Sequence, residues 1–206
     1  MFLSNQEQLV QYLISSGILR TPEIVAAFRQ VDRSDFVLEH YWNEAYQNYP
    51  LPIGLGQTIS QPSTVAFMLE LLDPRAGDVV LDIGSGSGWT TAMLAFLVGN
   101  TGYVTGVEIL PELVAFGRGN LSRYPFVNAS ILPARKEGLG IPGNIFDRIL
   151  VSAGARSFPE GLLDQLNPEG KLVIPVGNSI FLYEKDNERA VYREEFPGFV
   201  FVPLKV

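Results

Sequence analysis

The segment LDIGSGSGW, residues 81–89, decides the fold of this chain. A hydrophobic strand pattern runs directly into Gly84, Gly86 and Gly88, and a helical pattern begins at once. Glycines at such a turn allow positive φ angles and let a ligand approach the main-chain N–H groups. The next strand pattern ends at Glu108, about 20 residues beyond the last glycine, where a carboxylate can accept hydrogen bonds from a ribose diol. The segment therefore predicts a nucleotide-type site at a strand-to-helix turn.

The spacing of this turn and the acid beside it indicate which ligand fits. The glycines follow the pattern GxGxG and not the GxGxxG of dinucleotide sites, whose third glycine allows close helix–strand packing. Asp82 lies just before the turn, where it would repel a pyrophosphate but could orient a cationic ligand directly or through water. These features favour S-adenosylmethionine, whose sulfonium and ammonium groups are positive. The alternatives are NAD and a tight turn that binds nothing.

Outward from the turn, strand and helix patterns alternate. Strand patterns occupy residues 78–84, 102–109, 127–132, 146–154 and 170–177, and helical patterns occupy 90–98, 111–124 and 159–166. The series predicts a doubly wound, mostly parallel α/β sheet, with an antiparallel C-terminal edge formed by 179–186 and 190–204. The length favours a single domain over 1–206, divided into a helical N-terminal extension (1–48), a loop (49–63) and the α/β core (64–206).

The composition limits the chemistry. The 206 residues contain no cysteine and one histidine, His40, which excludes disulfides, thiol nucleophiles and Cys/His metal sites, so no metal is expected. We interpret His40 as a surface residue. The net charge of −7, without a cluster of Lys and Arg, argues against a nucleic-acid partner. Neither a membrane-spanning run nor a signal-peptide pattern occurs, so we expect a soluble, cytoplasmic monomer that does not bind membranes.

Residues 50–62, PLPIGLGQTISQP, are apolar but rich in proline and glycine, which suits an ordered loop packed on the protein body. This loop resembles the signature loop of the protein-L-isoaspartate O-methyltransferase family. Further matches occur in GILRTPEIVAAFRQVDRSDFV (17–37), FDRILVSAGA (146–155), LVIPVG (172–177) and FVPL (201–204). The resemblance covers nearly the whole chain and implies a Rossmann-like class I methyltransferase fold with a mostly parallel, seven-stranded sheet.

The resemblance also implies a reaction and a site. The expected reaction is S-adenosylmethionine-dependent methylation of the α-carboxylate of L-isoaspartyl residues in damaged proteins and peptides. By position, Ser60 takes the active-site role. The implied cofactor-binding residues are Ile59, Asp82, Gly84, Ser85, Gly86, Gly88, Glu108 and Leu113. The implied substrate-binding residues are Ile53, Gly54, Gln57, Thr58 and Val202.

This reaction agrees with the small inventory of catalytic groups. A carboxylate with a pKa of about 4 is already ionised at neutral pH, so its methylation requires no general base. Catalysis can come from placing one carboxylate oxygen in line with the methyl group in a dry pocket. The hydroxyl of Ser60 would orient that carboxylate.

One segment, 133–144, departs from the family pattern, in which a GDG-type motif supplies an acid to the adenine amino group. Glu137 is the acid that can replace it here, whereas Arg135 or Lys136 cannot accept a hydrogen bond from that group. Two alternatives follow. The chain is a diverged methyltransferase acting on another carboxylate or peptide, or it has kept the fold with weakened cofactor binding.

Overall fold

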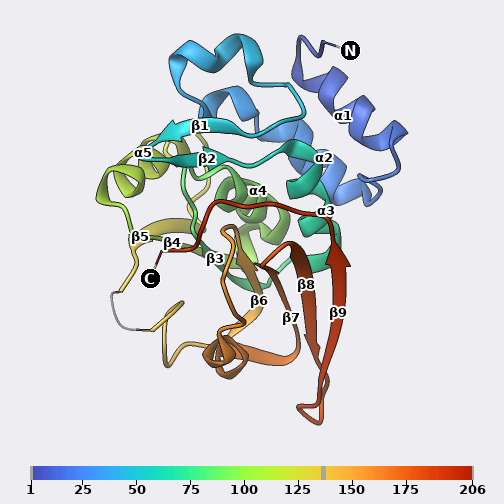
Figure 1. The fold of residues 1–206 in the computed structure, drawn as a ribbon, viewed down its shortest axis with the longest axis vertical. Helices are drawn as coiled ribbons and strands as arrows, with labels where there is room; N and C mark the ends of the chain where they lie inside the picture. The colour runs from blue at the N-terminus through green and yellow to red at the C-terminus, as the bar shows by residue number, and fades with distance from the viewer. Residues whose placement is uncertain (1, 136–137, 206) are drawn as a thin grey trace.

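The structure, a computed structural model, describes residues 2–135 and 138–205 (Figure 1). The α-helices are α1 (Gln6–Ser15), α2 (Pro22–Gln30), α3 (Pro62–Leu72), α4 (Trp89–Val98) and α5 (Pro111–Leu121). The 3-10 helices are η1 (Arg33–Phe36), η2 (Glu39–Glu44), η3 (Gly99–Thr101) and η4 (Glu160–Gln165). The strands are β1 (Leu51–Gly54), β2 (Gln57–Ile59), β3 (Val79–Ile83), β4 (Tyr103–Glu108), β5 (Ala129–Pro133), β6 (Phe146–Val151), β7 (Leu166–Val176), β8 (Ser179–Lys185) and β9 (Val191–Pro197).

A seven-stranded sheet forms the centre of the molecule, with the strand order β5-β4-β3-β6-β7-β8-β9. The pairs from β5 to β7 are parallel, whereas β8 and β9 pair antiparallel. The predicted fold class is therefore confirmed, including its antiparallel C-terminal edge, but the last strand ends at Pro197 and does not extend to 204 as predicted. The chain runs from β3 outward to β5 and then returns to β6 on the other side of β3. Ligands bind at such switch points in open α/β sheets, outside the carboxyl ends of the strands.

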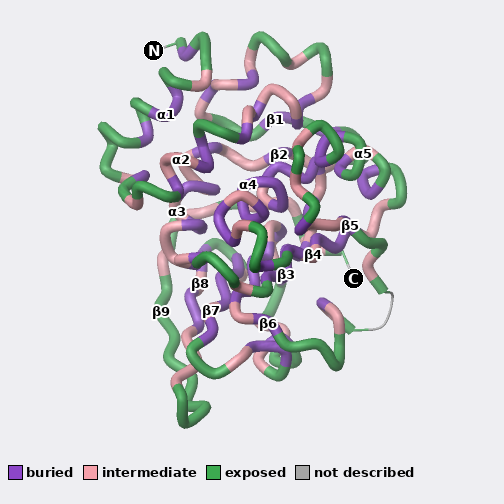
Figure 2. The backbone as a smooth tube through the Cα atoms, turned by 180° about the vertical axis from the view of Figure 1, so that it is seen from behind, coloured by how far each residue is buried: buried purple, intermediate pink, exposed green. Residues whose placement is uncertain are grey.

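Alternate residues of the sheet face two apolar layers. One layer contains Val80, Val104 and Leu150 together with the buried faces of α3, α4 and α5. The opposite layer contains Leu81, Ile149 and the side chain of Leu162 from η4. Figure 2 shows that α4 and the central strands are mostly buried, while the edge strand β9 is exposed. The prediction of an α-helix over 159–166 is wrong, because these residues form only the 3-10 helix η4.

The N-terminal extension packs on the first of these layers. Helix α2 has Thr21 as its N-cap and Pro22 as its first residue. Proline is tolerated there because its missing N–H would have no helical partner. Ile24, Ala27 and Phe28 recur at helical spacing and form the buried face of α2, which contacts α4. The ring of Phe28 meets that of Trp89 edge-on, with ring centroids 5.6 Å apart.

The predicted loop over 49–63 is ordered, and it contains a short hairpin. Strands β1 and β2 pair antiparallel, with Leu51 opposite Ile59. Gly54, Leu55 and Gly56 at the hairpin tip all have positive φ angles, of 93°, 54° and 73°. The many prolines and glycines disfavour a long central strand but permit an isolated two-stranded hairpin of this length.

Candidate active site

A cleft lies where the sequence places the glycine turn, at the carboxyl ends of three neighbouring strands. Gly84 follows β3, Glu108 ends β4 and Ser152 follows β6, and all three line the cleft. Its empty volume is about 900 Å³, partly open to solvent. Its position at a switch point of the sheet is one where ligands bind in open α/β folds.

The glycine turn is held against β4. The N–H groups of Gly84 and Ser85 both donate to the carbonyl of Val107, at 2.8 and 3.1 Å. Gly84 and Gly86 line the cleft, and both have positive φ angles, of 78° and 51°. Gly88 does not line the cleft. A Cβ there would lie 3.0 Å from the carbonyl oxygen of Gly117, so this glycine serves the packing of α5 on the turn.

Glu108 is the carboxylate that faces the cleft. Its side chain is buried, with 6% of its surface exposed. One carboxylate oxygen accepts from the N–H of Gly86 at 3.0 Å, and the other accepts from the N–H of Leu110 at 2.9 Å. These two bonds fix the orientation of the carboxylate and leave lone pairs on both oxygens. The geometry suits the predicted pair of hydrogen bonds from a ribose diol.

Asp82, a predicted cofactor contact, does not line the cleft. It is fully buried and accepts hydrogen bonds from the hydroxyls of Thr90 at 2.8 Å, Thr91 at 2.6 Å and Ser152 at 3.3 Å. Burial raises the pKa of the Asp82 carboxyl, and the three hydroxyl donors act in the opposite direction. The structure provides no direct contact between Asp82 and the cleft, so any effect on a ligand acts through these hydroxyls or through its field.

A smaller cavity adjoins the glycine turn and is lined mostly by hydroxyl-bearing residues. It has an empty volume of about 310 Å³, and Thr58, Ser60, Ser85 and Ser152 are among its walls. Ile59, a predicted cofactor contact, also lines it. The hydroxyl of Ser85 is buried and, within the described part of the chain, has no hydrogen-bond partner. A buried hydroxyl without a partner costs free energy, so Ser85 is suited to bind a polar group of a ligand.

An open groove lies beside this cavity. Its walls come from the hairpin, from the start of α3 and from the C-terminal segment, and they include Pro50, Thr64, Phe201 and Val202. Ser60 lines both the groove and the hydroxyl-lined cavity. Thr58 lines both and the main cleft as well. The hairpin therefore places Ser60 between a space for a small ligand and a surface open to a larger one.

The C-terminal segment is fixed to the sheet by main-chain hydrogen bonds. The N–H of Gly154 donates to the carbonyl of Val202, and the N–H of Leu204 donates to the carbonyl of Gly154, both at 2.8 Å. Val202 thereby reaches the boundary between the cleft and the groove.

Most of the other predicted residues also meet here. Ile53, Gln57 and Leu113 line the main cleft, whereas the exposed Gly54 lies at the hairpin tip and lines none of the three spaces. Ser152, to which the sequence assigned no chemistry, lines both the cleft and the hydroxyl-lined cavity. Ser152 directly follows β6, as the glycine turn follows β3, and both strands end at the same edge of the sheet. This position in the sequence is the signal that could have identified Ser152.

The departing segment 133–144 forms one wall of the cleft. Ala134, Arg135 and the residues from Gly138 to Gly140 line it, while Lys136 and Glu137 lie outside the described residues. Gln165 holds this wall in place, since its amide accepts from the N–H of Ile141 at 2.7 Å and donates to the carbonyl of Leu139 at 2.8 Å. The predicted substitution of Glu137 for the family's adenine-binding acid therefore stays a prediction.

Comparison with known proteins identifies the family. A family model described as protein-L-isoaspartate(D-aspartate) O-methyltransferase matches residues 4–206. This chain belongs to that family. A protein-L-isoaspartate O-methyltransferase of Methanopyrus kandleri is 44% identical over 211 residues, covering 98% of this chain and 92% of the relative. Protein-L-isoaspartate O-methyltransferase 2 of Archaeoglobus fulgidus is 42% identical over 190 residues, covering 89% of this chain and 85% of the relative.

The family fold extends across the whole chain. A Plasmodium falciparum structure, described as a protein-L-isoaspartate O-methyltransferase in complex with S-adenosyl-L-homocysteine, has a TM-score of 0.86 and 29% sequence identity. It covers 98% of this chain and 99% of that one. The N-terminal extension and the hairpin are thus part of the protein-L-isoaspartate O-methyltransferase fold. No helix in the described ranges is both long and apolar enough to cross a bilayer.

Proposed function

We propose that this protein transfers the methyl group of S-adenosylmethionine to the α-carboxylate of L-isoaspartyl residues in damaged proteins and peptides. The observation that carries the proposal is the position of Ser60, which lines both the hydroxyl-lined cavity beside the glycine turn and the open groove. A small cofactor on one side and a peptide on the other can meet at this residue. Family membership supports the same reaction.

The residues of the cleft fit S-adenosylmethionine. Glu108 presents a fixed carboxylate to a ribose diol, and the hydroxyl of Ser85 in the adjoining hydroxyl-lined cavity, which has no partner among the described residues, suits the polar end of the methionine moiety. Leu113 and Ile53 supply apolar walls beside them. The carboxylate of Glu108, which lines the cleft, favours a cationic ligand over a pyrophosphate. When bound, the cofactor supplies a methyl group activated by the positive sulfur.

The protein's own residues bind the substrates, orient the acceptor carboxylate and exclude water from the site. The acceptor carboxylate is ionised at neutral pH, so no residue needs to remove a proton. His40 is exposed, as expected, and packs on the ring of Tyr41 outside the three spaces. Ser60 donates a hydrogen bond to one oxygen of the acceptor, which leaves the other directed at the methyl group. Val202 offers main-chain groups to the substrate peptide, and Gln57 and Thr58 close the hairpin side. Orientation of this kind can supply roughly 7–11 kcal/mol of the barrier.

The test is a pair of peptides that differ in one linkage. The protein should form a base-labile methyl ester on an isoaspartyl peptide and none on the aspartyl peptide of the same sequence. Calorimetry with S-adenosylhomocysteine should show binding. Equal labelling of both peptides, or methylation only of a different acceptor, would contradict the proposed substrate. Absence of cofactor binding would support the alternative of a fold that has lost its activity.

Ser60→Ala should lower kcat by about 10-fold or more, because the acceptor loses one orienting hydrogen bond. Ser122→Ala is the matched control, since Ser122 is exposed and donates only to the carbonyl of Gly119 in its own helix. Equal kcat values for the two variants would remove Ser60 from the mechanism.

The proposal also includes the organisation and surroundings of the protein. Residues 1–206 act as a single domain and as a monomer in the cytoplasm, on protein substrates and not on nucleic acid or membranes. The net charge of −7 supports the last point. Light scattering should give the mass of one chain, and addition of duplex DNA or anionic vesicles should leave that mass unchanged.

A further inference from the structure

Arg33 is a buried arginine near Ser60, outside the three spaces of the candidate site. It is the first residue of η1, and only 1% of its surface is exposed. Its guanidinium donates four hydrogen bonds to carbonyl oxygens: to Ala45 at 2.7 Å, Gln47 at 3.2 Å, Tyr49 at 3.0 Å and Ser60 at 3.0 Å.

The surroundings of Arg33 contain carbonyl oxygens and an aromatic ring in place of a carboxylate. No ion pair of Arg33 occurs in the described part of the chain. Buried charges are usually paired, because their desolvation is costly. Burial lowers the pKa of Arg33 to about 9, which still leaves the cation intact at neutral pH. Because burying this charge costs free energy, packing alone does not explain an arginine at this position.

The hydrogen bonds of Arg33 converge on the open end of the hairpin. Leu51 and Ile59 form the last pair of β1 and β2 at that end. Tyr49 and Ser60 lie just beyond this pair, one on each side. A single nitrogen, Nη2, donates to both of their carbonyls. Arg33 therefore bridges the two chain segments beyond the point where the strands bond to each other. This bridge fixes the backbone of Ser60.

The guanidinium also links the hairpin to the glycine turn. Its central carbon lies 5.4 Å from the ring centroid of Trp89, the first residue of α4, which directly follows the turn. Cation–π contact favours a guanidinium in this position. Because Trp89 and Ser60 both line the hydroxyl-lined cavity, Arg33 sets the spacing of its two walls from behind.

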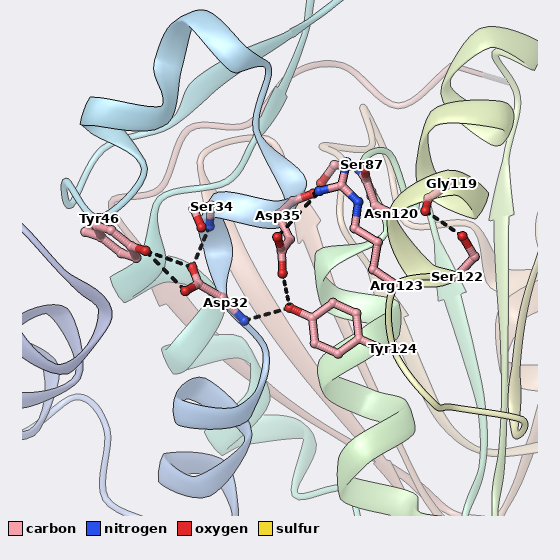
Figure 3. Close-up of polar contacts among 10 residues, drawn as sticks. All are labelled: Asp32, Ser34, Asp35, Tyr46, Ser87, Gly119, Asn120, Ser122, Arg123 and Tyr124. Atoms are coloured by element: carbon pink, nitrogen blue, oxygen red, sulfur yellow. Dashed lines mark hydrogen bonds and ion pairs between the residues drawn. The ribbon is translucent and has the colours of Figure 1, made fainter.

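The backbone of η1 is anchored on both sides of Arg33 (Figure 3). The hydroxyl of Tyr124 donates to the carboxylate of Asp35 at 2.7 Å and accepts from the N–H of Asp32 at 2.9 Å. Asn120, nearby at the end of α5, donates to the carbonyl of Ser87 in the glycine turn at 3.0 Å. The residues at and just after the end of α5 thus connect η1 to the glycine turn. The backbone of Arg33 is therefore held in a fixed position relative to the turn.

We propose that Arg33 is a positioning residue for methyl transfer, which holds Ser60 at the correct distance from the glycine turn. The inference rests on the proposed function, since it assigns to Ser60 the orientation of the acceptor carboxylate. Arg33 itself touches neither cofactor nor substrate. Its effect is on kcat, because the acceptor is misplaced, and not on cofactor affinity, because neither Glu108 nor Ser85 is among the hydrogen-bond partners of Arg33.

The test is Arg33→Lys, which keeps the charge but cannot reach two carbonyls with a planar fork. We expect kcat for the isoaspartyl peptide to fall about 10- to 100-fold, since a displacement of about 1 Å can cost that much. The Kd for S-adenosylhomocysteine should stay within about twofold of the wild-type value. In a Ser60→Ala background the same change should lower kcat by less than about threefold, because the hydroxyl that Arg33 positions is already absent.

Arg148→Lys is the matched control. Arg148 is also buried, and it donates to the carbonyls of Asp73 and Asp147 at the opposite end of β6 from the site. The Arg148→Lys variant should be less stable than the wild type in urea denaturation but should keep the wild-type kcat. If Arg33→Lys does not fold, Arg33→Gln replaces it, because a neutral amide is buried at lower cost.

Wild-type kcat in the folded Arg33 variant, or an equal loss of kcat with and without Ser60, would overturn the inference alone. If the wild-type protein does not methylate the isoaspartyl peptide, the proposed function fails and this inference fails with it.

Discussion

Substitution of a single glycine on α5 tests whether close packing on the glycine turn forms the cofactor cleft. Gly117 is buried against the turn, and a Cβ there would lie 2.8 Å from the carbonyl oxygen of Gly86 and 2.9 Å from a methyl carbon of Ile131. A real Cβ cannot approach a backbone oxygen so closely, so Gly117→Ala must push α5 away from Gly86. Gly119, two residues further along the same helix, has no heavy atom within 4 Å of the equivalent position.

Both alanine variants gain helix propensity, but only Gly117→Ala introduces a steric clash. Replacing glycine by alanine in a helix stabilises it by roughly 0.5–1 kcal/mol, and this gain applies to both positions. Overpacking costs roughly 1–3 kcal/mol and applies only to Gly117. The difference between the variants is therefore about 1–3 kcal/mol, with Gly119→Ala the more stable. The propensity term cancels in that difference.

Urea denaturation of both variants measures this difference, and calorimetry with S-adenosylhomocysteine measures its effect on the cleft. Displacement of Gly86 also disturbs its N–H bond to Glu108, so Gly117→Ala should weaken binding by about tenfold or more, which is about 1.4 kcal/mol. Gly119→Ala should bind as the wild type does. Equal stability and equal affinity of the two variants would refute the view that α5 is fitted to the turn.

Three further substitutions test other parts of the site. Glu108→Gln should weaken S-adenosylhomocysteine binding by roughly 1.5–3 kcal/mol in calorimetry, because hydrogen bonds to a charged acceptor are lost, and an unchanged Kd would exclude the ribose contact. Burial raises the pKa of Asp82, so folding favours its protonated form and Asp82 costs stability as the pH rises from about 4 through its folded pKa. Asp82→Asn should therefore gain stability relative to wild type over that range in urea titrations, and a difference that is flat with pH would contradict this sign. Tyr124→Phe should lose about 1–3 kcal/mol in urea denaturation, since it leaves the N–H of Asp32 without its partner and removes one of two donors to the carboxylate of Asp35, the other being Arg123. The exposed Tyr192→Phe should lose almost nothing, and similar losses would contradict the anchoring of η1.

The elements that the sequence predicts well are those whose signals are local. The strand patterns, the glycine turn and the position of Glu108 at a strand end depend on periodicity and on a few neighbouring residues. Parallel order then follows from the alternation of strands and helices, and it brings Gly84, Glu108 and Ser152 to one sheet edge.

Other features depend on residues far apart in the chain, which no local pattern reveals. Asp82 is enclosed because Thr90, Thr91 and Ser152 close over it, and the last of these follows another strand, β6. The failure at 159–166 is also physical: the helical pattern spans too few residues for a stable α-helix, and a 3-10 turn satisfies the same backbone. No local pattern indicates that Arg33 is buried, because its carbonyl partners lie 12 to 27 residues further along the chain.

The first turn of α4 connects these buried groups. Gly88 sets the approach of α5, Trp89 packs under the guanidinium of Arg33, and Thr90 and Thr91 hold the carboxylate of Asp82. A helix N-terminus carries partial positive charge, which stabilises a buried carboxylate beside it. One turn of helix thus fixes the guanidinium of Arg33 on the hairpin side and the carboxyl group of Asp82 on the sheet side, with the cofactor cleft and Ser60 between them. In a reaction that needs no proton transfer, these two groups serve geometry, because Arg33 and Asp82 fix the surroundings of the cleft without lining it.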